Sequence, residues 1–340
     1  MRNVGLIGAG NISDTHARAA VAAGLQVVAV CGDNRDKSQQ LAAQHDATAF
    51  DTRDAFLNCQ DVELVMIGSP SGRHAEQAAA VVRSGRHVLV EKPLDISTDR
   101  VDALLEEVAS AGVTLGVFFQ DRLKPDVLRL KQALTSDAIG TTVLATGEVK
   151  WSRPASYYAG SRWRGRWALD GGGALMNQGI HTVDLLLYLL GPAVRVSGVI
   201  ATRVHHIEAE DTAAATIEFE SGAIATIAAT TAAADGQPRR VEIIGSRGSL
   251  VLVGDDLIDP AATRPNHTPE NARSPVVSDV SAHQRIIEDF VDAVRRGRPP
   301  VCDGREGRRS VAVVEAVYRS AREKRVVDLR REPRPLGRPD

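Results

Sequence analysis

The sequence predicts an α/β domain built on a parallel sheet, followed by an α+β domain built on a mostly antiparallel, open sheet. Short apolar strands alternate with helices up to Phe119, a pattern typical of repeated βα units. Beyond Lys124, stretches with a period of two residues dominate. The length of 340 residues also exceeds that of most single domains. We therefore expect domains at residues 1–123 and 124–330, with a disordered tail at residues 331–340.

Composition and charge exclude several classes of protein. The chain is 43% hydrophobic and 25% charged with a net charge of −2, which favours neither nucleic acid nor an anionic membrane as a partner. Its cysteines, Cys31, Cys59 and Cys302, are scattered and odd in number, so we expect no disulfide framework, no metal site and a cytoplasmic location. The apolar run Leu185–Leu190 is too short to span a bilayer.

A glycine-rich stretch at residues 8–13 lies between a strand and a helix. The strand Val4–Ile7 precedes it, the helix runs to Ala23, and a second strand follows at Gln26–Val30. This order is that of the dinucleotide-binding fingerprint, with Ser13 in place of the third glycine. The stretch therefore predicts a Rossmann domain.

Each position of the fingerprint has a physical task. Gly8 makes the tight turn, and Gly10 lets a pyrophosphate approach the backbone. The first N–H groups of the helix, at Asn11 and Ile12, face no earlier turn and suit phosphate oxygens. These four residues are the predicted phosphate site.

The end of the second strand bears on the choice of cofactor. Asp33 follows the fingerprint at the distance where a carboxylate binds the ribose hydroxyls of NAD, and Asn34 lies beside it. Gly32 and Arg35 leave NADP open, because an arginine there can accept the 2′-phosphate. We expect NAD, with NADP as the alternative.

Later strands of the first domain end in polar residues. Ligands of doubly wound sheets bind at the carboxyl ends of the strands, where we expect the cofactor. The residues predicted there, besides the fingerprint, are Ser69, Pro70, Glu91 and Lys92. His74, four residues after Pro70, is also expected to contact the cofactor. The alternative for Lys92 is a lysine at a strand end that is exposed to solvent and has no role in binding or catalysis.

The second half of the chain is predicted to form a sheet, with one helix before its strands and two helices after them. The helices are expected near residues 125–135, 281–295 and 306–324, and Pro260–Pro275 reads as a polar loop. The expected strands are residues 142–149, 194–202, 213–219, 223–230, 240–244 and 249–253.

Three glycines, Gly171 to Gly173, precede an apolar helix expected from Leu175 to Leu190. Asn177, His181 and Asp184 follow one another at helical spacing and share a face of that helix. A histidine in such a place is by itself most often a core residue. The predicted nucleotide site and Lys92 favour instead a functional role for His181.

An aromatic and basic stretch lies just before this helix. Arginines between aromatic rings suit a sugar or a nearby phosphate, and we expect Tyr158, Trp163 and Arg164 to contact the substrate. The alternative is a loop that packs over the sheet or supports a subunit contact. The stretch contains Trp151, Arg153, Tyr157, Tyr158, Trp163, Arg164 and Trp167.

The chain resembles the glucose–fructose oxidoreductase and inositol dehydrogenase family (Gfo/Idh/MocA) over residues 1–330. The combination of Glu-Lys-Pro with a triple glycine, histidine and aspartate helix is specific, whereas neither part is so alone. The resemblance rests on Gly8-Ala9-Gly10-Asn11-Ile12, Ser69-Pro70-Ser71 with His74, Gly85 to Pro93, Gly171 to Leu175 with His181 and Asp184, Glu210-Asp211-Thr212, and Gly245 to Gly248.

The resemblance implies site residues and an assembly. Lys92 and His181 correspond to the residues that flank the reacting carbon. Asn177 stands where the family often has aspartate. This difference bears on the class of substrate more than on whether the protein is active. Arg122 matches a position that is often basic and faces substrate. Family members often form dimers or tetramers through the outer face of the open sheet.

We expect an NAD(P)-dependent oxidoreductase that interconverts a secondary alcohol of a sugar, sugar derivative or cyclitol and its ketone. His181 would accept the hydroxyl proton, Lys92 would lower the pKa of that hydroxyl, and Asn177 would hold a hydroxyl or orient the ring. One alternative is a redox-neutral enzyme that cleaves a glycosidic bond using tightly bound NAD. Another is a dinucleotide-sensing protein without catalysis.

Overall fold

The computed structural model describes residues 1–258 and 279–331. The chain divides into two compact units, Met1–Leu123 with Pro275–Arg308 and Lys124–Ser274 with Arg309–Asp340. The predicted polar loop at residues 260–275 lies outside the described residues. So does the predicted tail apart from Arg331, which ends a 3-10 turn.

The first unit is built on a parallel sheet, as predicted. Among its described residues the strand order is β3-β2-β1-β4-β5-β6 and every pair is parallel. The order reverses between β1 and β4, which is where such sheets bind their ligands. The strands are β1 Asn3–Ile7, β2 Gln26–Cys31, β3 Thr48–Phe50, β4 Leu64–Ile67, β5 His87–Val90 and β6 Leu115–Val117.

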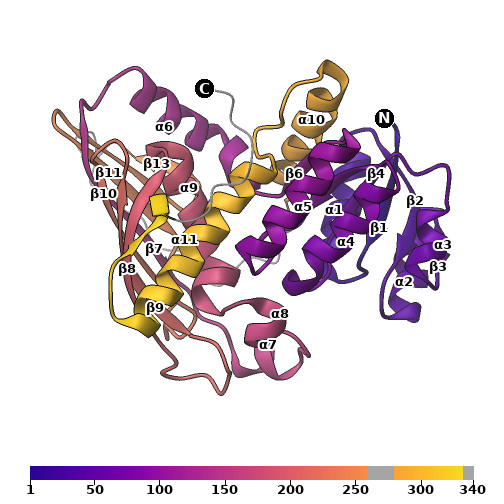
Figure 1. Ribbon diagram of the computed structural model, residues 1–340, viewed down its shortest axis with the longest axis horizontal. Helices are drawn as coiled ribbons and strands as arrows, with labels where there is room; N and C mark the ends of the chain where they lie inside the picture. Colours follow the sequence, from indigo (N-terminus) through magenta and orange to yellow (C-terminus); the bar gives the residue numbers. More distant parts are fainter. Residues whose placement is uncertain (259–278, 332–340) are drawn as a thin grey trace. The chain divides into compact units, whose positions relative to one another are not determined.

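Helices cover both faces of this sheet (Figure 1). Right-handed crossovers place the helices that follow β1 and β2 on one face and those that follow β4 and β5 on the other. Thr52 and Asn34 cap their helices with side-chain oxygens. The helices that connect the strands are α1 Asn11–Ala22, α2 Arg35–Ala43, α3 Arg53–Leu57, α4 His74–Arg83 and α5 Thr98–Ala111.

A helix from far along the chain completes the first unit. Helix α10 (Ser281–Arg296) was predicted as part of the second domain, but it packs against α1. Its Ile286, Ile287 and Phe290 join the same buried cluster as Val4 and Leu6. The apolar stripe of a helix predicts that it is buried, but not against which sheet.

The second unit is built on a mostly antiparallel sheet, as predicted. Its described strands follow the order β13-β12-β11-β7-β10-β9-β8-β14, and of these only β7 and β10 pair in parallel. The short strands β13 and β14 were not predicted. The strands are β7 Thr142–Lys150, β8 Ala193–Ala201, β9 Thr212–Phe219, β10 Ile224–Thr230, β11 Arg240–Gly245, β12 Ser249–Val253, β13 Asp256–Ile258 and β14 Val327–Asp328.

One face of this sheet is covered by helices. A Cβ on Gly147 would lie 2.7 Å from Thr182 of α9, and one on Gly198 would lie 2.7 Å from Val317 of α11, so glycine admits both helices. On β9 and β10 buried and more exposed residues alternate. The helices with residues in this unit are α6 Pro125–Thr135, α7 Ala155–Ala159, α8 Trp167–Asp170, α9 Ile180–Leu190 and α11 Gly304–Glu323, which begins in the first unit.

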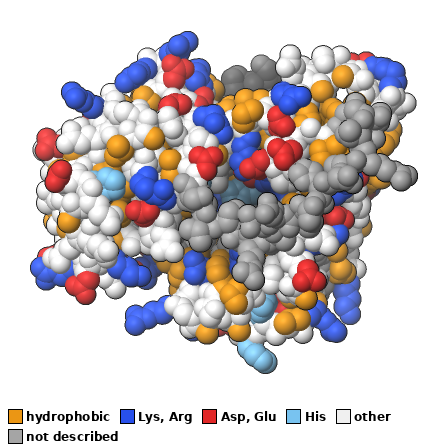
Figure 2. Space-filling model, turned by 180° about the vertical axis from the view of Figure 1, so that it is seen from behind, with side chains coloured by type: hydrophobic (Ala, Val, Ile, Leu, Met, Phe, Trp, Pro, Cys, Tyr) orange, Lys and Arg blue, Asp and Glu red, His pale blue; other side chains and the backbone are white. Residues whose placement is uncertain are grey.

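The surface is of mixed charge. On the face that Figure 2 shows, basic and acidic side chains are interspersed, in keeping with the net charge of −2. None of the described helices combines the length and the apolar character that a bilayer crossing requires.

Candidate functional site

The glycines of the nucleotide loop differ in what surrounds them. Gly8 has a φ of +111°, and a Cβ on it would lie 2.7 Å from the carbonyl oxygen of Gly68. Gly10 has open space, since its Cβ would meet no atom within 4 Å. Gly8 is therefore required by the turn, whereas Gly10 leaves the backbone accessible to a large group. Both features fit a dinucleotide.

Ser13 explains how the loop tolerates a missing glycine. Its side chain is buried, and its Oγ lies 3.0 Å from the site of a Cβ on Gly8. A small residue fits there and a larger one would not. No side chain in the described chain caps the start of α1, so the N–H groups of Asn11 and Ile12 lie where a phosphate can bind them.

The three residues after β2 have different surroundings. Asp33 is 76% exposed, and its carboxylate accepts a hydrogen bond from the Arg73 guanidinium. Asn34 accepts from the N–H of Lys37 at 2.9 Å and so caps α2. Arg35 pairs with Asp51 at 3.1 Å. Arg73 was missed by sequence reasoning, because only the fold brings it beside β2.

His74 is a buried link between two turns. Its Nδ1 lies 2.7 Å from the carbonyl oxygen of Pro93, and its Nε2 lies 2.9 Å from that of Ser69. The Ser69 hydroxyl donates to Gln77 at 2.6 Å. Pro70 caps the 3-10 turn that leads into α4. His74 thus holds the strand ends together, and a direct contact with the cofactor stays a prediction for it.

Glu91 points into the first unit. Its buried carboxylate lies 2.9 Å from Nε2 of His16 on α1. Burial raises the pKa of Glu91, but the His16 hydrogen bond and the nearby positive charge outweigh burial and lower the pKa to about 2. Glu91 is therefore an anchor, and the half-buried Lys92 follows it at the end of β5.

The same anchor includes a second histidine. Ligand-type atoms of His16, Glu91 and His283 all lie within 4.8 Å of one another, and all three residues are buried. They come from α1, the end of β5 and α10, so the sequence could not reveal the group. The hydrogen bond between His16 and Glu91 already joins two of the possible ligand atoms, which a metal ion would have to displace.

Arg122 lies inside the first unit. Its side chain is buried, and its Nη1 donates to Glu306 at 3.0 Å and to the carbonyl oxygen of Val301 at 3.2 Å. The resemblance suggested a substrate contact. These partners hold the guanidinium within the unit, and a substrate contact stays a prediction for Arg122.

The helix with Asn177 and His181 begins differently from the expectation. A π-helical turn, Ala174–Gly179, precedes α9, in place of one α-helix from Leu175. Such turns often occur at functional sites. Asn177 and His181 are half-buried, whereas Asp184 is fully buried.

A buried carboxylate holds the start of the π-helical turn. Oε2 of Glu210 accepts from the N–H of Gly173 at 2.9 Å, and Oε1 accepts from the N–H of Leu175 at 2.8 Å and the Tyr318 hydroxyl at 2.8 Å. Burial raises the pKa of Glu210 to about 7, although these donors oppose the shift. The pKa of Tyr318 is also raised, by burial and by Glu210. The sequence offered Glu210 only as part of a motif.

Asn177 belongs to a hydrogen-bonded chain. Its Nδ2 donates to Oδ1 of the buried Asp170 at 2.6 Å. Its Oδ1 accepts from Nε2 of Gln178 at 2.8 Å. Gln178 in turn accepts from the Arg153 guanidinium at 2.8 Å and donates to the Tyr157 hydroxyl at 3.0 Å. The chain of contacts joins the π-helical turn to the aromatic stretch.

Two guanidinium groups lie over one aromatic ring. The Cζ atoms of Arg153 and Arg164 lie 5.1 and 4.3 Å from the ring centroid of Tyr157. Trp163 also lies under Arg164, at 5.1 Å. Among the described residues neither arginine forms an ion pair, and the Nε of each is buried without a hydrogen-bond partner. This basic cluster is a candidate anion site.

Two other aromatic residues are structural. Tyr158 is buried, donates to the Thr231 hydroxyl at 2.8 Å, and has a pKa raised to about 12 by burial. Trp167 donates to the carbonyl oxygen of Glu208 and meets Tyr318 edge to face. Of the predicted substrate contacts in this stretch, Trp163 and Arg164 belong to the basic cluster. The Tyr158 ring meets that of Tyr157 edge to face at 5.0 Å, and a substrate contact stays a prediction for it.

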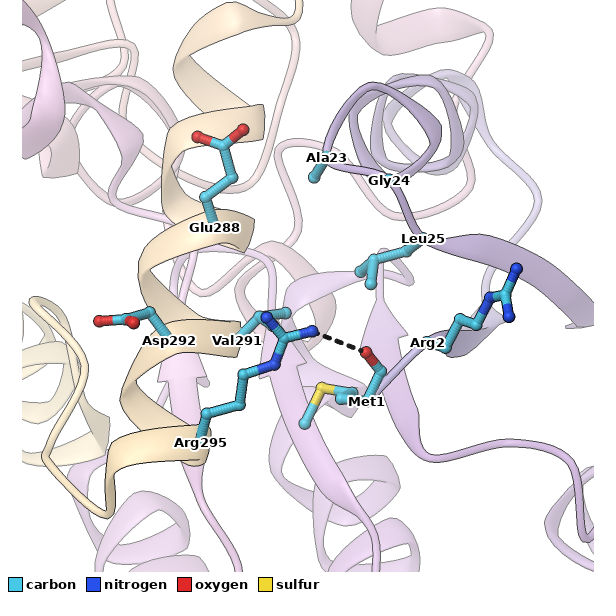
Figure 3. Close-up of a pocket in the computed structure, with 9 residues that line it drawn as sticks. All are labelled: Met1, Arg2, Ala23, Gly24, Leu25, Glu288, Val291, Asp292 and Arg295. Atoms are coloured by element: carbon cyan, nitrogen blue, oxygen red, sulfur yellow. Dashed lines mark hydrogen bonds between the residues drawn. The ribbon is translucent and has the colours of Figure 1, made fainter.

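A pocket of the first unit is lined by none of the residues of the nucleotide loop (Figure 3). It is lined by residues next to the amino ends of β1 and β2 and by α10, where Arg295 donates to the carbonyl oxygen of Met1 at 3.5 Å. Doubly wound sheets bind their ligands at the opposite, carboxyl edge. We therefore assign the cofactor to the loop at Gly8 and Gly10.

The first unit has a nucleotide loop at the switch point of a parallel sheet, and the second has the half-buried His181 on α9, directly after a π-helical turn. Together these features define a dinucleotide-binding oxidoreductase. Comparison with known families agrees. Residues 2–119 match the model of an oxidoreductase family with an NAD-binding Rossmann fold, and residues 127–251 match the GFO/IDH/MocA C-terminal domain. The chain belongs to the Gfo/Idh/MocA family of NAD-dependent oxidoreductases.

Individual relatives are similar over nearly the whole chain. The WlbA dehydrogenase from Bordetella pertussis, solved with NADH and UDP-GlcNAcA, is 31% identical with a TM-score of 0.86, covering 96% of this chain and 98% of that one. The Chromobacterium violaceum WlbA dehydrogenase, in the same kind of complex, is 28% identical with a TM-score of 0.87, covering 98% and 97%. Inositol 2-dehydrogenase of Rhizobium meliloti is 27% identical, covering 96% and 98%. The predicted family, fold, NAD cofactor and oxidoreductase class are confirmed.

Proposed function

We propose that the protein oxidises a secondary alcohol on a sugar that carries an anionic group, with a nucleotide-linked sugar uronic acid as the foremost substrate. The observation that carries this proposal is the basic cluster. Arg153 and Arg164 lie over Tyr157, with no carboxylate partner among the described residues. Both arginines are half-buried, and guanidinium groups of this kind favour a phosphate or carboxylate ligand.

The relatives support this choice of substrate class. Two of the solved structures contain UDP-GlcNAcA, a sugar with both a diphosphate and a carboxylate, whereas the Rhizobium enzyme is named for a neutral cyclitol. A neutral cyclitol would leave the two guanidinium groups without a counter-charge. The basic cluster therefore favours the anionic sugar.

In the proposed chemistry, NAD held at the loop of Gly8 and Gly10 would supply the acceptor for the hydride of the carbinol carbon. His181 accepts the hydroxyl proton, and Lys92 lowers the pKa of that hydroxyl. Asn177 orients a hydroxyl by hydrogen bonding, because an amide does not exchange a proton at neutral pH.

NADH formation across a substrate panel tests the proposal. The panel contains UDP-GlcNAcA, UDP-GlcNAc, glucuronic acid and myo-inositol, which separate diphosphate, carboxylate and neither. We expect the highest kcat/KM with UDP-GlcNAcA, and Arg164→Ala should raise its KM about 10-fold or more, the cost of one charge-assisted contact. A higher kcat/KM with myo-inositol would overturn the proposal. Product without net NADH would indicate the redox-neutral alternative.

We also propose that the protein assembles with copies of itself through the outer face of its second sheet. Leu144, Val199 and Ile224 project from this face and are 38%, 66% and 44% exposed. Exposed apolar residues gathered on one sheet face are typical of an interface.

A further inference from the structure

Asp170 lies between the aromatic stretch and the π-helical turn. It is 1% exposed at the end of α8, directly before the three glycines. Both of its carboxylate oxygens have donors. Oδ2 accepts from the N–H of Gly165 at 2.8 Å, and Oδ1 accepts from Nδ2 of Asn177 at 2.6 Å.

The direction of every hydrogen bond in this network is set by chemistry. A guanidinium only donates and an ionised carboxylate only accepts, so Arg153 and Asp170 fix the two ends. Between them, Gln178 must accept from Arg153 with its oxygen and donate to Asn177 with its nitrogen, and Asn177 must donate to Asp170. Donation therefore runs in one direction from the basic cluster to the buried carboxylate.

The buried carboxylate accounts for the amide at position 177. An aspartate there, as the family often has, would place a second carboxylate about 2.6 Å from that of Asp170. Two carboxyl groups at that distance do not both ionise, so one of them would keep its proton. The same aspartate would be compatible with an asparagine at position 170.

We propose that Asp170 is a positioning residue that acts through Asn177 and Gln178, and that positions 170 and 177 accept one carboxylate and one amide in either order. In the reversed pair, the oxygen of an asparagine at 170 accepts from Gly165 and its nitrogen donates to an aspartate at 177. The second oxygen of that aspartate accepts from Gln178. Every donor thus keeps an acceptor.

The positioning role rests on the proposed function, because it concerns residues that are proposed to act on the substrate. Asp170 holds Asn177 in the turn before His181, and Asn177 in turn contacts Gln178, the partner of Arg153. The exchange of the pair does not rest on it, since it concerns folding alone. The two parts can therefore fail separately.

Three variants test the exchange without a substrate: Asn177→Asp, Asp170→Asn and the two together. Thermal unfolding is followed from pH 5 to pH 8.5 with NADH present. We expect Asn177→Asp to lose Tm progressively as the pH rises, because the shared proton is lost, and the double variant to regain most of that loss. Additive losses in the double variant, or an Asn177→Asp protein as stable as the wild type at pH 8.5, would overturn the exchange.

Other titratable groups near the pair are present in the wild type and in every variant. Comparing the Tm of each variant with that of the wild type at the same pH therefore removes their contribution. Tyr158 and Tyr318 stay neutral over this range, since their pKa values are raised to about 12 and well above 10. Glu210, which accepts from the Tyr318 hydroxyl, has a pKa of about 7 and titrates in every variant. His181, four residues after Asn177, is unchanged in every variant. Asn58→Asp and Asp61→Asn, both at exposed positions, control for the charge change.

Kinetics test the positioning role on the best substrate of the panel. We expect Asn177→Asp to lower kcat/KM about 10- to 100-fold at pH 8, and the double variant to recover to within about threefold, the size of effect that one charge-assisted hydrogen bond supports. A double variant that regains stability but stays as slow as Asn177→Asp would overturn the positioning role. If no panel substrate is oxidised, the proposed function fails while the stability result still decides the exchange.

Discussion

Two residues, Lys92 and His181, carry the proposed acid–base chemistry, and the structure gives each a firm support. Lys92 follows Glu91, whose carboxylate is tied to His16 at 2.9 Å. His181 follows a π-helical turn that the Glu210 carboxylate holds by two backbone N–H groups. Proton transfer requires accurately placed side chains. Side chains on rigid supports move little and so keep the required positions.

Replacing either residue should affect the chemical step more than cofactor binding. We expect Lys92→Ala and His181→Ala each to lower kcat by about 10²- to 10⁴-fold, because each removes a proton-transfer or hydroxyl-polarising group. The NADH dissociation constant, from fluorescence titration, should change by less than about threefold. Lys37→Ala and His206→Ala, both at exposed positions, are the matched controls. Activity unchanged in both variants would contradict the assigned roles.

The preference for NAD should depend on Asp33. Its exposed carboxylate would repel a 2′-phosphate bound beside it. Arg73 contacts this carboxylate, and Arg35 lies two residues further along the chain. We expect Asp33→Ser to shift the ratio of kcat/KM for NAD over NADP toward NADP by about 10- to 100-fold, since Arg73 then lacks its carboxylate partner. Initial rates with each cofactor measure the ratio. A ratio that stays constant would show that Asp33 does not face the ribose.

At the scale of elements, the start of the π-helical turn leaves little room for side chains. A Cβ on Gly173 would lie 1.9 Å from the carbonyl oxygen of Glu210, and one on Gly172 would lie 2.0 Å from the Tyr318 hydroxyl. A side chain on Gly173 would require the backbone at Glu210 to move, and one on Gly172 would require the Tyr318 side chain to move. Gly172 and Gly173 therefore admit Tyr318 and Glu210 to the turn.

Glu210 should make the stability of the second unit depend on pH. Its pKa is raised in the folded state from 4.5 to about 7, so its contribution is fully present below pH 4.5 and is lost as the pH rises through 7. The full effect is about 3 kcal/mol. Glu210→Gln should abolish this dependence, although its amide cannot accept from Gly173. Denaturant midpoints between pH 5 and 8.5 measure this pH dependence. If the midpoints of variant and wild type change with pH by the same amount, the role of Glu210 is refuted.

At the scale of the whole molecule, the uncovered sheet face predicts the assembly. Val199→Glu with Ile224→Glu places two charges on this face and should convert an oligomer to monomers, because a buried unpaired carboxylate costs several kcal/mol. Light scattering after gel filtration measures the mass. Val204→Glu, at a position 62% exposed outside the strands, is the control. A wild-type protein that is monomeric at micromolar concentration would contradict the proposal.

Local chemistry was enough to predict the parts of the protein that depend on consecutive residues. The turn at Gly8, the helix Thr98–Ala111 and the strand Ser249–Val253 were all readable, because backbone freedom and side-chain periodicity act over a few residues. The cofactor and the family followed from the spacing of such segments.

Contacts between distant residues needed the tertiary structure. Sequence alone could not reveal that Asp170 faces Asn177, that Arg73 faces Asp33, or that Glu210 and Tyr318 hold the π-helical turn. Hydrogen bonds and ion pairs of this kind act over a few ångströms, and only folding brings their partners within that distance. The sequence thus determined which chemical groups are available, and the fold decided which of them meet.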